Sequence, residues 1–385
     1  MKGRIQDIEL LRAVAVLSVV LHHAHGNLLT WPTPWLDAFF EHFDLWWGVD
    51  LFFAISGYVI ARELLPKLQS CTSMAGYWRI TLAFWTRRAF RLLPSAWLWL
   101  ILILLACRFL NTSGAFGTLQ ANLAATLAGA LQFANFRFAD SFMRYEYGTS
   151  FVYWSLSLEE QFYLLLPVLV LLSRGFLPWL LLLLVAVQFF TWRTPLLMSV
   201  RTDAIALGVL LAFWSQTRTC GALKLRFLHR RLLALGIAAL LVLVMMEAST
   251  QKYVWNTYRI GVIALCSAGL VWLASLDRNY FALPAQLQRA MLWIGSRSYA
   301  IYLVHIPAFS LTQEIWYRLR GTKDLDGSYT WAFTITVSLL VLVTSELNYR
   351  WVENPLRRQG AHLAKRLSLP APTATPAQRT NNETA

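Results

Sequence analysis

Long apolar runs recur along most of the chain, and they constrain its fold more than any other feature. The runs "SAWLWLILILLACRFL" and "LLALGIAALLVLVMM" approach the length of about 20 residues that a helix needs to cross a bilayer. They do not alternate between apolar and polar residues as the strands of a membrane β-barrel do. With 57% hydrophobic and 14% charged residues, the chain is also too apolar for a soluble domain. The sequence therefore predicts an all-α, polytopic membrane helix bundle.

About ten membrane-spanning helices are expected from these runs. They fall at 8–26, 45–65, 89–109, 155–173, 176–192, 202–216, 232–248, 259–275, 291–316 and 330–349. Segment 117–136 is also apolar, but its glutamines and asparagines make it a poor span. If it does not cross, most of the 34 lysines and arginines lie on the N-terminal side, whereas a crossing divides them almost evenly. Because cytoplasmic loops are rich in positive charge, we expect both termini in the cytoplasm and segment 117–136 to be interfacial, re-entrant or packed on the outer face.

The ends of the chain indicate one retained membrane domain. Asp7, Glu9 and Arg12 lie in or beside the first apolar run, which is unlike a cleaved signal peptide. We expect residues 1–358 to form the membrane domain and the Pro-, Thr- and Ala-rich residues 359–385 to be a disordered cytoplasmic tail. The net charge of +14 is attributed to membrane orientation rather than to nucleic-acid binding. The scattered cysteines indicate neither a disulfide framework nor a metal site: Cys71, Cys107, Cys220 and Cys266.

Ionisable residues inside the apolar runs form two layers. Arg12 and His23 are about three helical turns apart and share one face of the first helix, from which His22 and His25 point away. Counting residues along each span places His23 and His305 in the outer half of the membrane. The same count places four carboxylates at a similar depth: Asp50, Glu159, Glu160 and Asp203. This outer layer is suited to acid/base chemistry.

The second layer is basic and lies near the cytoplasmic face. It consists of Arg12, Arg88 and Arg91, of which the last two are three residues apart and share a helix face. The planar guanidinium group binds phosphate with two parallel hydrogen bonds and stays charged at any relevant pH. A phosphorylated cytoplasmic donor below an acid/base layer describes a transmembrane group-transfer site.

Seven stretches in order along the chain resemble those of the acyltransferase 3 family of integral membrane acyltransferases. They are "LLRAVAVLSVVLHHAHG", "GVDLFFAISGYVIAR", "RRAFRLLP", "WSLSLEEQFYLLLP", "RTDAIALGVLLA", "SYAIYLVHIP" and "NYRWVENPLRR". The resemblance implies transfer of an acyl group, commonly acetyl, from cytoplasmic acyl-CoA to a hydroxyl on the far side of the membrane. The commonest acceptors are cell-envelope glycans. Many members carry a C-terminal SGNH esterase-like domain that this sequence does not include, so we expect acceptor recognition to lie in the membrane domain and its loops.

The resemblance also assigns roles to individual residues. The family pattern Arg-x10-His falls on Arg12 and His23, and the pattern Arg-x-x-Arg falls on Arg88 and Arg91. We expect the three arginines to bind coenzyme A phosphates and His23 to act as general base.

The carboxylates and the remaining polar residues are assigned less uniquely. One of Glu159 and Glu160 is expected to orient or stabilise His23. Four further residues either line the substrate cavity or pair structurally, and Arg201 could pair with Asp203: Asp50, Arg201, Asp203 and His305.

The combined reading is an O-acyltransferase of the bacterial inner membrane that uses acyl-CoA, normally acetyl-CoA, as donor and holds no permanent cofactor. Its partners would be acyl-CoA, a glycan or lipid-linked sugar acceptor and the lipid bilayer, with no nucleic acid. The alternative is a transporter or exporter, because charged residues in spans also line solute paths. Against it, the sequence shows no repeat and no matching pair of broken spans. A structural or receptor membrane protein is a third possibility.

Overall fold

The computed structural model describes residues 5–173, 175–217, 230–250, 252 and 256–368, and within them the regular structure is helical. The α-helices are α1 (Gln6–Asn27), α2 (Pro34–His42), α3 (Gly48–Gln69), α4 (Met74–Phe109), α5 (Leu119–Ala130), α6 (Ala134–Ser141), α7 (Tyr153–Ser173), α8 (Leu177–Phe190), α9 (Pro195–Ser199), α10 (Asp203–Ser215), α12 (Arg231–Ala248), α13 (Arg259–Ser275), α14 (Ala285–Ser296), α15 (Ser298–Arg320), α16 (Thr330–Asn348) and α17 (Asn354–Ser368). A 3₁₀ turn at Gly327–Tyr329 precedes α16, and a π-helical turn at Tyr349–Glu353 joins α16 to α17.

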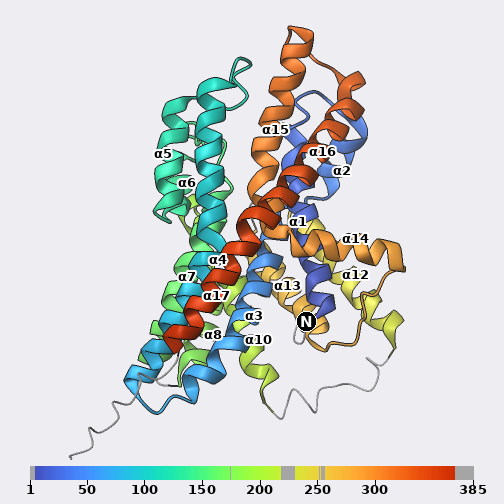
Figure 1. Cartoon of the computed structure of the whole chain (residues 1–385). Helices are drawn as coiled ribbons and strands as arrows, with labels where there is room; N and C mark the ends of the chain where they lie inside the picture. Colours follow the sequence, from blue (N-terminus) through green and yellow to red (C-terminus); the bar gives the residue numbers. More distant parts are fainter. Residues whose placement is uncertain (1–4, 174, 218–229, 251, 253–255, 369–385) are drawn as a thin grey trace, which may run out of the picture.

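Length and composition support the membrane assignment. Within the described residues, six helical segments are long and apolar enough to cross a bilayer: Gln6–Asn27, Met74–Phe109, Tyr153–Ser173, Pro195–Ser215, Arg231–Ala248 and Gly327–Ser368. Two shorter apolar helices, α8 and α13, accompany them. The predicted all-α polytopic bundle is therefore confirmed. In Figure 1 the first residues of α1 and the end of α17 both lie in the lower half of the bundle.

Two predicted spans have different limits in the structure. The span expected at 89–109 belongs to α4, which begins at Met74, so Arg88 lies about 21 Å along the helix instead of at its end. The span expected at 291–316 is divided at Arg297 into α14 and α15. There the Arg297 guanidinium bonds to Glu346 at 2.7 Å and lies 4.4 Å from the centroid of the Tyr349 ring, which fixes the corner between the two helices.

Segment 117–136 forms two short helices rather than one span. α5 extends for 12 residues, about 18 Å, which is shorter than the hydrocarbon layer. It ends where Gln132 adopts a φ of 60°, a left-handed conformation that a helix interior does not tolerate. α5 lies beside the upper part of α4, and α6 packs against α7 (Figure 1). The prediction that segment 117–136 is not a membrane span agrees with the short length of α5.

The boundary expected at residue 358 is wrong for the first ten residues beyond it. α17 continues to Ser368, and its buried residues Gly360 and Ala364 face α4. A Cβ atom at position 360 would lie 2.4 Å from the Cβ of Phe90, so the missing side chain lets the two helices touch. The boundary was misjudged because only two small residues of this polar segment, Gly360 and Ala364, form the buried face of the helix. Residues 369–385 and most of the basic segment 218–231, with Cys220, lie outside the described residues.

α3 occupies the interior of the bundle and packs most closely against α10. A Cβ atom on Gly57 would lie 2.1 Å from the carbonyl oxygen of Ile205, and one on Gly208 would lie 2.2 Å from that of Ala54. Small residues of this kind let helix backbones approach within a membrane, where van der Waals packing stabilises association. This contact holds α3 in the position from which its residues line the cavities described below.

Gly57→Ala is therefore expected to destabilise the protein by about 1–3 kcal/mol, because backbone atoms must move to admit the methyl group. Gly236→Ala in α12 is the matched control, since no atom lies within 4 Å of the position of its Cβ. Thermal unfolding in detergent should show a lower Tm for Gly57→Ala and an unchanged or higher Tm for Gly236→Ala. Equal Tm values for the two variants would contradict the role of this contact.

Candidate active site

The outer cavity has a volume of about 400 Å³ and contains His23 in its wall. It lies where the end of α1 meets the starts of α3, α7 and α13. Helical geometry in α1 stops after Ala24, because His25 and Gly26 leave the helical region and Gly26 has a φ of 83°. His23 is thus held in the last regular turn. The wall is rich in aromatic and cationic side chains, among them Trp46, Phe138, Phe142, Phe151, Trp154, Trp192, Arg193, Arg201 and Arg259.

His23 is hydrogen-bonded to a second histidine from a distant part of the chain. Its Nδ1 lies 2.9 Å from Nε2 of His305, and Nδ1 of His305 lies 2.7 Å from the carbonyl oxygen of Tyr302. The His23 and His305 ring planes differ by 19° and their centroids are 5.2 Å apart, values that are compatible with an in-line N–H···N hydrogen bond. Because a carbonyl oxygen only accepts, Nδ1 of His305 carries a proton. In the neutral pair, His305 Nε2 then accepts from His23 Nδ1, and His23 Nε2 is left unprotonated.

The other two histidines of α1 have carboxylate partners. His22 Nδ1 lies 2.6 Å from Asp44 Oδ1, and His25 Nε2 lies 3.0 Å from Asp37 Oδ1. His25 also stacks on Phe40, outside the wall of the outer cavity. Of the three histidines, only His23 bonds to another histidine within the described chain.

His305 is completely buried and is not part of the wall of the outer cavity. Of the two places expected for His305, the structure shows the structural pairing and not the substrate cavity, since α15 directs the ring onto His23. No sequence pattern joins these two residues, which are 282 positions apart. The sequence predicted a similar depth in the membrane for the two histidines but not the contact between them.

The inner cavity is smaller, about 60 Å³, and brings the three predicted arginines together. Arg12 from α1 and Arg88 and Arg91 from α4 line it with Ser56 and Glu159. The Arg88 guanidinium lies 5.3 Å from the centroid of the Tyr163 ring, and Arg12 is 3.4 Å from Glu9. The Nε atom of Arg91 is buried and has no hydrogen-bond partner within the described residues. The cavity is therefore a small, strongly cationic site.

The structure places Glu159 in this inner cavity and not beside His23. Its carboxylate accepts hydrogen bonds from Ser56 Oγ and Tyr163 Oη. Glu160 lines neither of the two cavities and lies at a minor void beside Gln132 and Tyr299. The expectation that one of the glutamates orients His23 is thus incorrect, because α7 directs both carboxylates toward the arginine level.

The two cavities share part of their walls. Val49 and Tyr302 line both of them. Tyr302 Oη is 2.7 Å from Ser155 Oγ and donates to the carbonyl oxygen of Val152 at 3.1 Å. The residues of the histidine cavity and of the arginine cavity are therefore separated by a thin layer of side chains. Tyr302 has a position between them that the sequence analysis did not single out.

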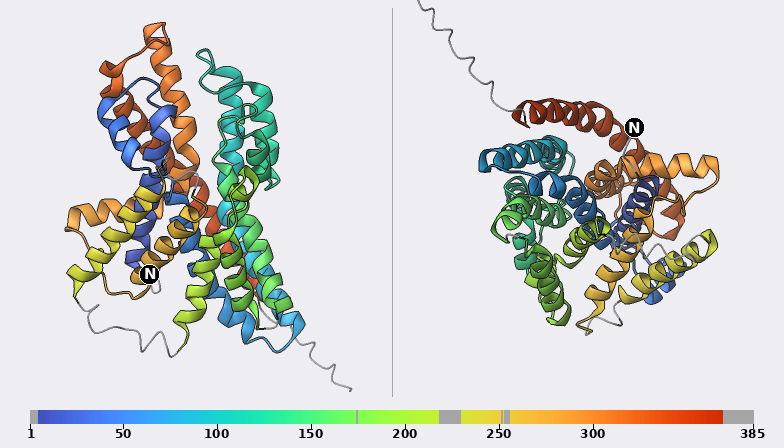
Figure 2. Two further views of the ribbon diagram at one scale, coloured as in Figure 1. Left: turned by 180° about the vertical axis from the view of Figure 1, so that it is seen from behind. Right: turned by 90° about the horizontal axis from the view of Figure 1, so that it is seen from below.

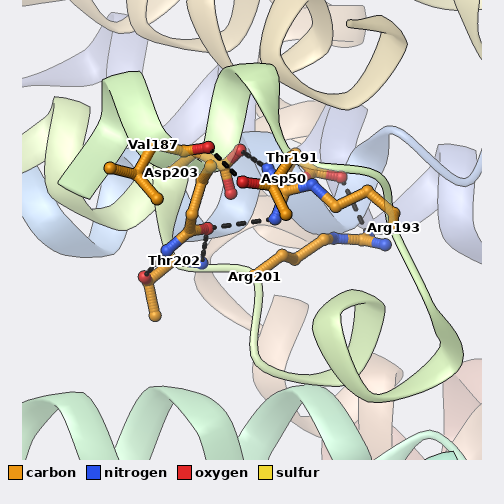
Figure 3. A network of polar contacts seen from close by, with 8 residues as sticks. Asp50, Val187, Thr191, Arg193, Arg201, Thr202 and Asp203 are labelled. Atoms are coloured by element: carbon orange, nitrogen blue, oxygen red, sulfur yellow. Dashed lines mark hydrogen bonds and ion pairs between the residues drawn. The ribbon is translucent and has the colours of Figure 1, made fainter. Parts of the chain in front are cut away.

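Two buried ion pairs adjoin the outer cavity, and Figure 3 shows the residues that form them. Arg201 Nη2 bonds to Asp50 Oδ2 at 2.9 Å, and Arg193 bonds to Asp203. The suggested pairing of Arg201 with Asp203 is therefore wrong, because the packing of α3 on α10 brings Asp50 to Arg201. The arginines line the cavity, whereas Asp50 and Asp203 do not.

Aromatic rings also pack against one of these ion pairs. The Arg201 guanidinium lies 5.1 Å from the Trp46 ring centroid and 5.0 Å from that of Trp154. Arg193 was missed by sequence reasoning because it lies in a short connection between apolar helices. The usable signal was the pair of buried aspartates, each of which requires a cation.

Asp50→Ala is expected to lower the free energy of unfolding by about 3–5 kcal/mol, because Arg201 would remain buried without its counter-charge. Chemical or thermal unfolding in detergent measures the loss. The double variant Asp50→Leu/Arg201→Met removes both charges and should recover much of the stability. If the double variant is as unstable as the sum of the single changes, the two residues do not stabilise each other.

Comparison with known proteins identifies the class to which this bundle belongs. The family model for the acyltransferase domain of the acyltransferase 3 family matches residues 5–345, and the chain belongs to that family. The match includes His23, His305 and all three arginines of the inner cavity. No solved structure matches the chain.

Several curated proteins resemble the chain over most of its length. It is 26% identical to the peptidoglycan O-acetyltransferase OatA of Listeria monocytogenes, over 92% of this chain and 56% of that protein. The putative peptidoglycan O-acetyltransferase YrhL of Bacillus subtilis is also 26% identical, over 92% of this chain and 55% of that protein. A putative O-acetyltransferase of Staphylococcus aureus is 24% identical, over 92% and 58%. The chain thus spans little more than half the length of these relatives.

Proposed function

We propose that the protein is an integral membrane O-acyltransferase that moves an acyl group, normally acetyl, from cytoplasmic acyl-CoA to a hydroxyl of a cell-envelope glycan. The observation that carries this proposal is the juxtaposition of a histidine cavity and an arginine cavity with shared walls. Membership of the acyltransferase 3 family and relatives named O-acetyltransferases support it. The excess of positive charge on the side of the termini supports an inner-membrane orientation with both termini in the cytoplasm.

The arginine cavity is the proposed donor site. Arg12, Arg88 and Arg91 would bind phosphate groups of coenzyme A through charge-assisted hydrogen bonds. Glu159 is the carboxylate that lines this cavity, and its bonds to Ser56 and Tyr163 keep its position fixed. The narrow acyl-pantetheine arm of the donor would then extend past Tyr302 toward His23.

His23 is the proposed general base. Its unprotonated Nε2 would accept the proton of the acceptor hydroxyl as the hydroxyl oxygen attacks the thioester carbonyl carbon. The tetrahedral intermediate then loses the coenzyme A thiolate, which breaks the C–S bond and leaves an O-acyl ester. The proton passes from His23 to the thiolate, so the base is regenerated. Transfer is direct, without an acyl-enzyme.

His305 would act on this reaction through His23. By accepting a hydrogen bond from His23 Nδ1–H, it keeps Nε2 available as the basic atom and fixes the orientation of the ring. Arg193 and Arg201, each neutralised by an aspartate behind the wall, would shape the acceptor side of the cavity.

Purified protein in liposomes tests the proposal. With radiolabelled acetyl-CoA and a panel of envelope glycans that includes peptidoglycan fragments, we expect label in an ester that mild base releases, and one free CoA per ester. Movement of a solute across the liposome membrane without release of CoA would favour a transporter instead. Absence of both acetyl-CoA binding and transfer would favour a structural or receptor protein.

A further inference from the structure

A groove at the edge of the bundle adjoins the cavity that contains His23. It has a volume of about 570 Å³ and lies between the last turns of α12 and the first turns of α13. Phe43, Leu243, Val244 and Val262 form its apolar part. Arg259, with Asn256, lines both the groove and the histidine cavity. The two spaces therefore meet at a guanidinium group.

The groove faces the surroundings of the bundle. α12 lies on its periphery in the view from below (Figure 2). Leu243 is 52% exposed and Val244 is 36% exposed, and both belong to a helix apolar enough to cross a bilayer. Apolar side chains with this exposure are in contact with lipid when the helix is in the membrane. A hydrocarbon chain can therefore enter the groove sideways from the bilayer.

Arg259 differs from the other two arginines of the outer cavity. Arg193 and Arg201 each pair with a buried aspartate, whereas Arg259 forms no ion pair within the described part of the chain. It donates to the carbonyl oxygen of Thr250 at 3.0 Å, and its guanidinium lies 5.5 Å from the Trp46 ring centroid.

Two acidic groups lie near Arg259, and within the described residues neither is close enough to form an ion pair with it. Glu247 lines the groove, and Asp44, in the cavity wall, is bonded to His22 at 2.6 Å. Arg259 is thus a cation between an apolar groove and the outer cavity, whose wall is aromatic and cationic.

We propose that the acceptor is a phosphate-bearing lipid, with its chain in the groove between α12 and α13, its phosphate on Arg259 and its sugar head group in the cavity beside His23. The three features occur in the same order as the parts of such a lipid. The apolar groove matches the hydrocarbon chain, the Arg259 guanidinium matches the phosphate, and the basic nitrogen of His23 lies where the sugar hydroxyl would be. Guanidinium binds phosphate in two-pronged fashion, which suits a position where the head group must be oriented. The role of this lipid as acyl acceptor rests on the proposed function, whereas its binding to the groove and to Arg259 does not.

Binding of defined lipids to the full chain in nanodiscs tests the inference. The probes are undecaprenyl phosphate, undecaprenol, which has the chain without phosphate, and glucose 1-phosphate, which has phosphate without the chain. We expect undecaprenyl phosphate to bind at least about 10-fold more tightly than either partial probe, as native mass spectrometry can measure. Arg259→Gln should weaken its binding by about 10- to 100-fold and remove the preference over undecaprenol.

Matched variants separate the parts of the inference. Arg259→Lys should retain part of the preference for phosphate, and Arg289→Gln, at an exposed arginine on α14, should leave all three affinities unchanged. Val262→Trp, which fills the groove, should weaken undecaprenyl phosphate and undecaprenol alike. Circular dichroism and thermal unfolding show whether each variant is folded.

Three results would overturn the inference: equal affinity for undecaprenyl phosphate and undecaprenol, unchanged binding in Arg259→Gln, or glucose 1-phosphate binding as tightly as the lipid. Turnover of acetyl-CoA reports on the proposed function separately, with a water-soluble glycan and a lipid-linked sugar offered in parallel as acceptors. A chain that acetylates soluble glycans but shows no preference for the lipid phosphate disproves the inference alone. A chain that binds the lipid phosphate but transfers no acetyl group to either the soluble glycan or the lipid-linked sugar disproves the proposed function alone.

Discussion

Replacement of His23 by alanine is expected to lower kcat for acyl transfer by about 10²- to 10⁴-fold, the range typical for loss of a general base. The imidazole Nε2 is the basic atom that remains unprotonated in the outer cavity, because His23 Nδ1 keeps its proton in the hydrogen bond to His305. Binding of acyl-CoA should persist, because Arg12, Arg88 and Arg91 line a different cavity. Release of CoA from labelled acetyl-CoA, followed by rapid quench, measures kcat, and equilibrium dialysis measures donor binding.

Two variants make this result specific. His25→Ala is the matched control: His25 pairs with Asp37 at 3.0 Å outside the cavity, and its loss should change kcat by no more than about twofold. His305→Ala should reduce kcat less than His23→Ala does, and His305→Gln, whose amide oxygen can accept the His23 proton, should restore part of the loss. Full activity in His23→Ala would exclude the proposed mechanism.

The second large effect is expected from the arginine pair of α4. Arg88→Gln/Arg91→Gln should raise KM for acetyl-CoA by about 100-fold or more, because each lost charge-assisted hydrogen bond weakens binding by about 1.5–3 kcal/mol. The effect on kcat at saturating donor should be much smaller, since neither guanidinium lies in the histidine cavity. Steady-state kinetics with varied acetyl-CoA separates the two constants.

Arg87→Gln is the control for charge near the same site. Arg87 is adjacent in sequence but is 3.8 Å from Glu63 and does not line the inner cavity. Its KM should stay close to that of the unchanged protein. Acetyl-dephospho-CoA, which lacks the 3′-phosphate, shows whether the arginines bind that group: the double variant should discriminate less between the two donors. If only the amount of inserted protein falls while KM is unchanged, the arginines act as orientation signals.

The parts of the site that sequence predicted are those that depend on one helix at a time. Arg12 and His23 share a face of α1 because helical periodicity alone determines it, and Arg88 and Arg91 face one cavity for the same reason. Contacts between helices that are far apart in the sequence were harder to predict. Similar depth brought His305 into consideration, but only the packing of α15 shows that its ring bonds to His23 and is closed off from the cavity.

The misplacement of Glu159 has a geometric cause. Counting residues from a common membrane plane assumes that helices begin at one level, but a Cβ atom on Gly48, at the start of α3, would lie 2.5 Å from the carbonyl oxygen of Ala15. α3 therefore begins about two turns below His23 along α1. Glu159 meets Ser56 on that lower helix and so belongs to the arginine level. The displacement of one helix along another is determined by how their side chains pack, and it cannot be predicted from the periodicity of a single sequence.

The shared wall of Val49 and Tyr302 has a consequence for the membrane as an electrical insulator. On the proposed function, the nucleotide of the donor stays in the cytoplasm and only the acyl end of the pantetheine arm passes this wall. A passage that opens between these side chains only as far as the arm requires, and that the arm itself fills during transfer, would limit leakage of protons and ions between the two compartments. Acetyl groups can then reach the outside without export of the activated donor. The free energy released when the thioester is cleaved would drive the modification, because the pantetheine arm extends through the wall and brings the thioester to the acceptor.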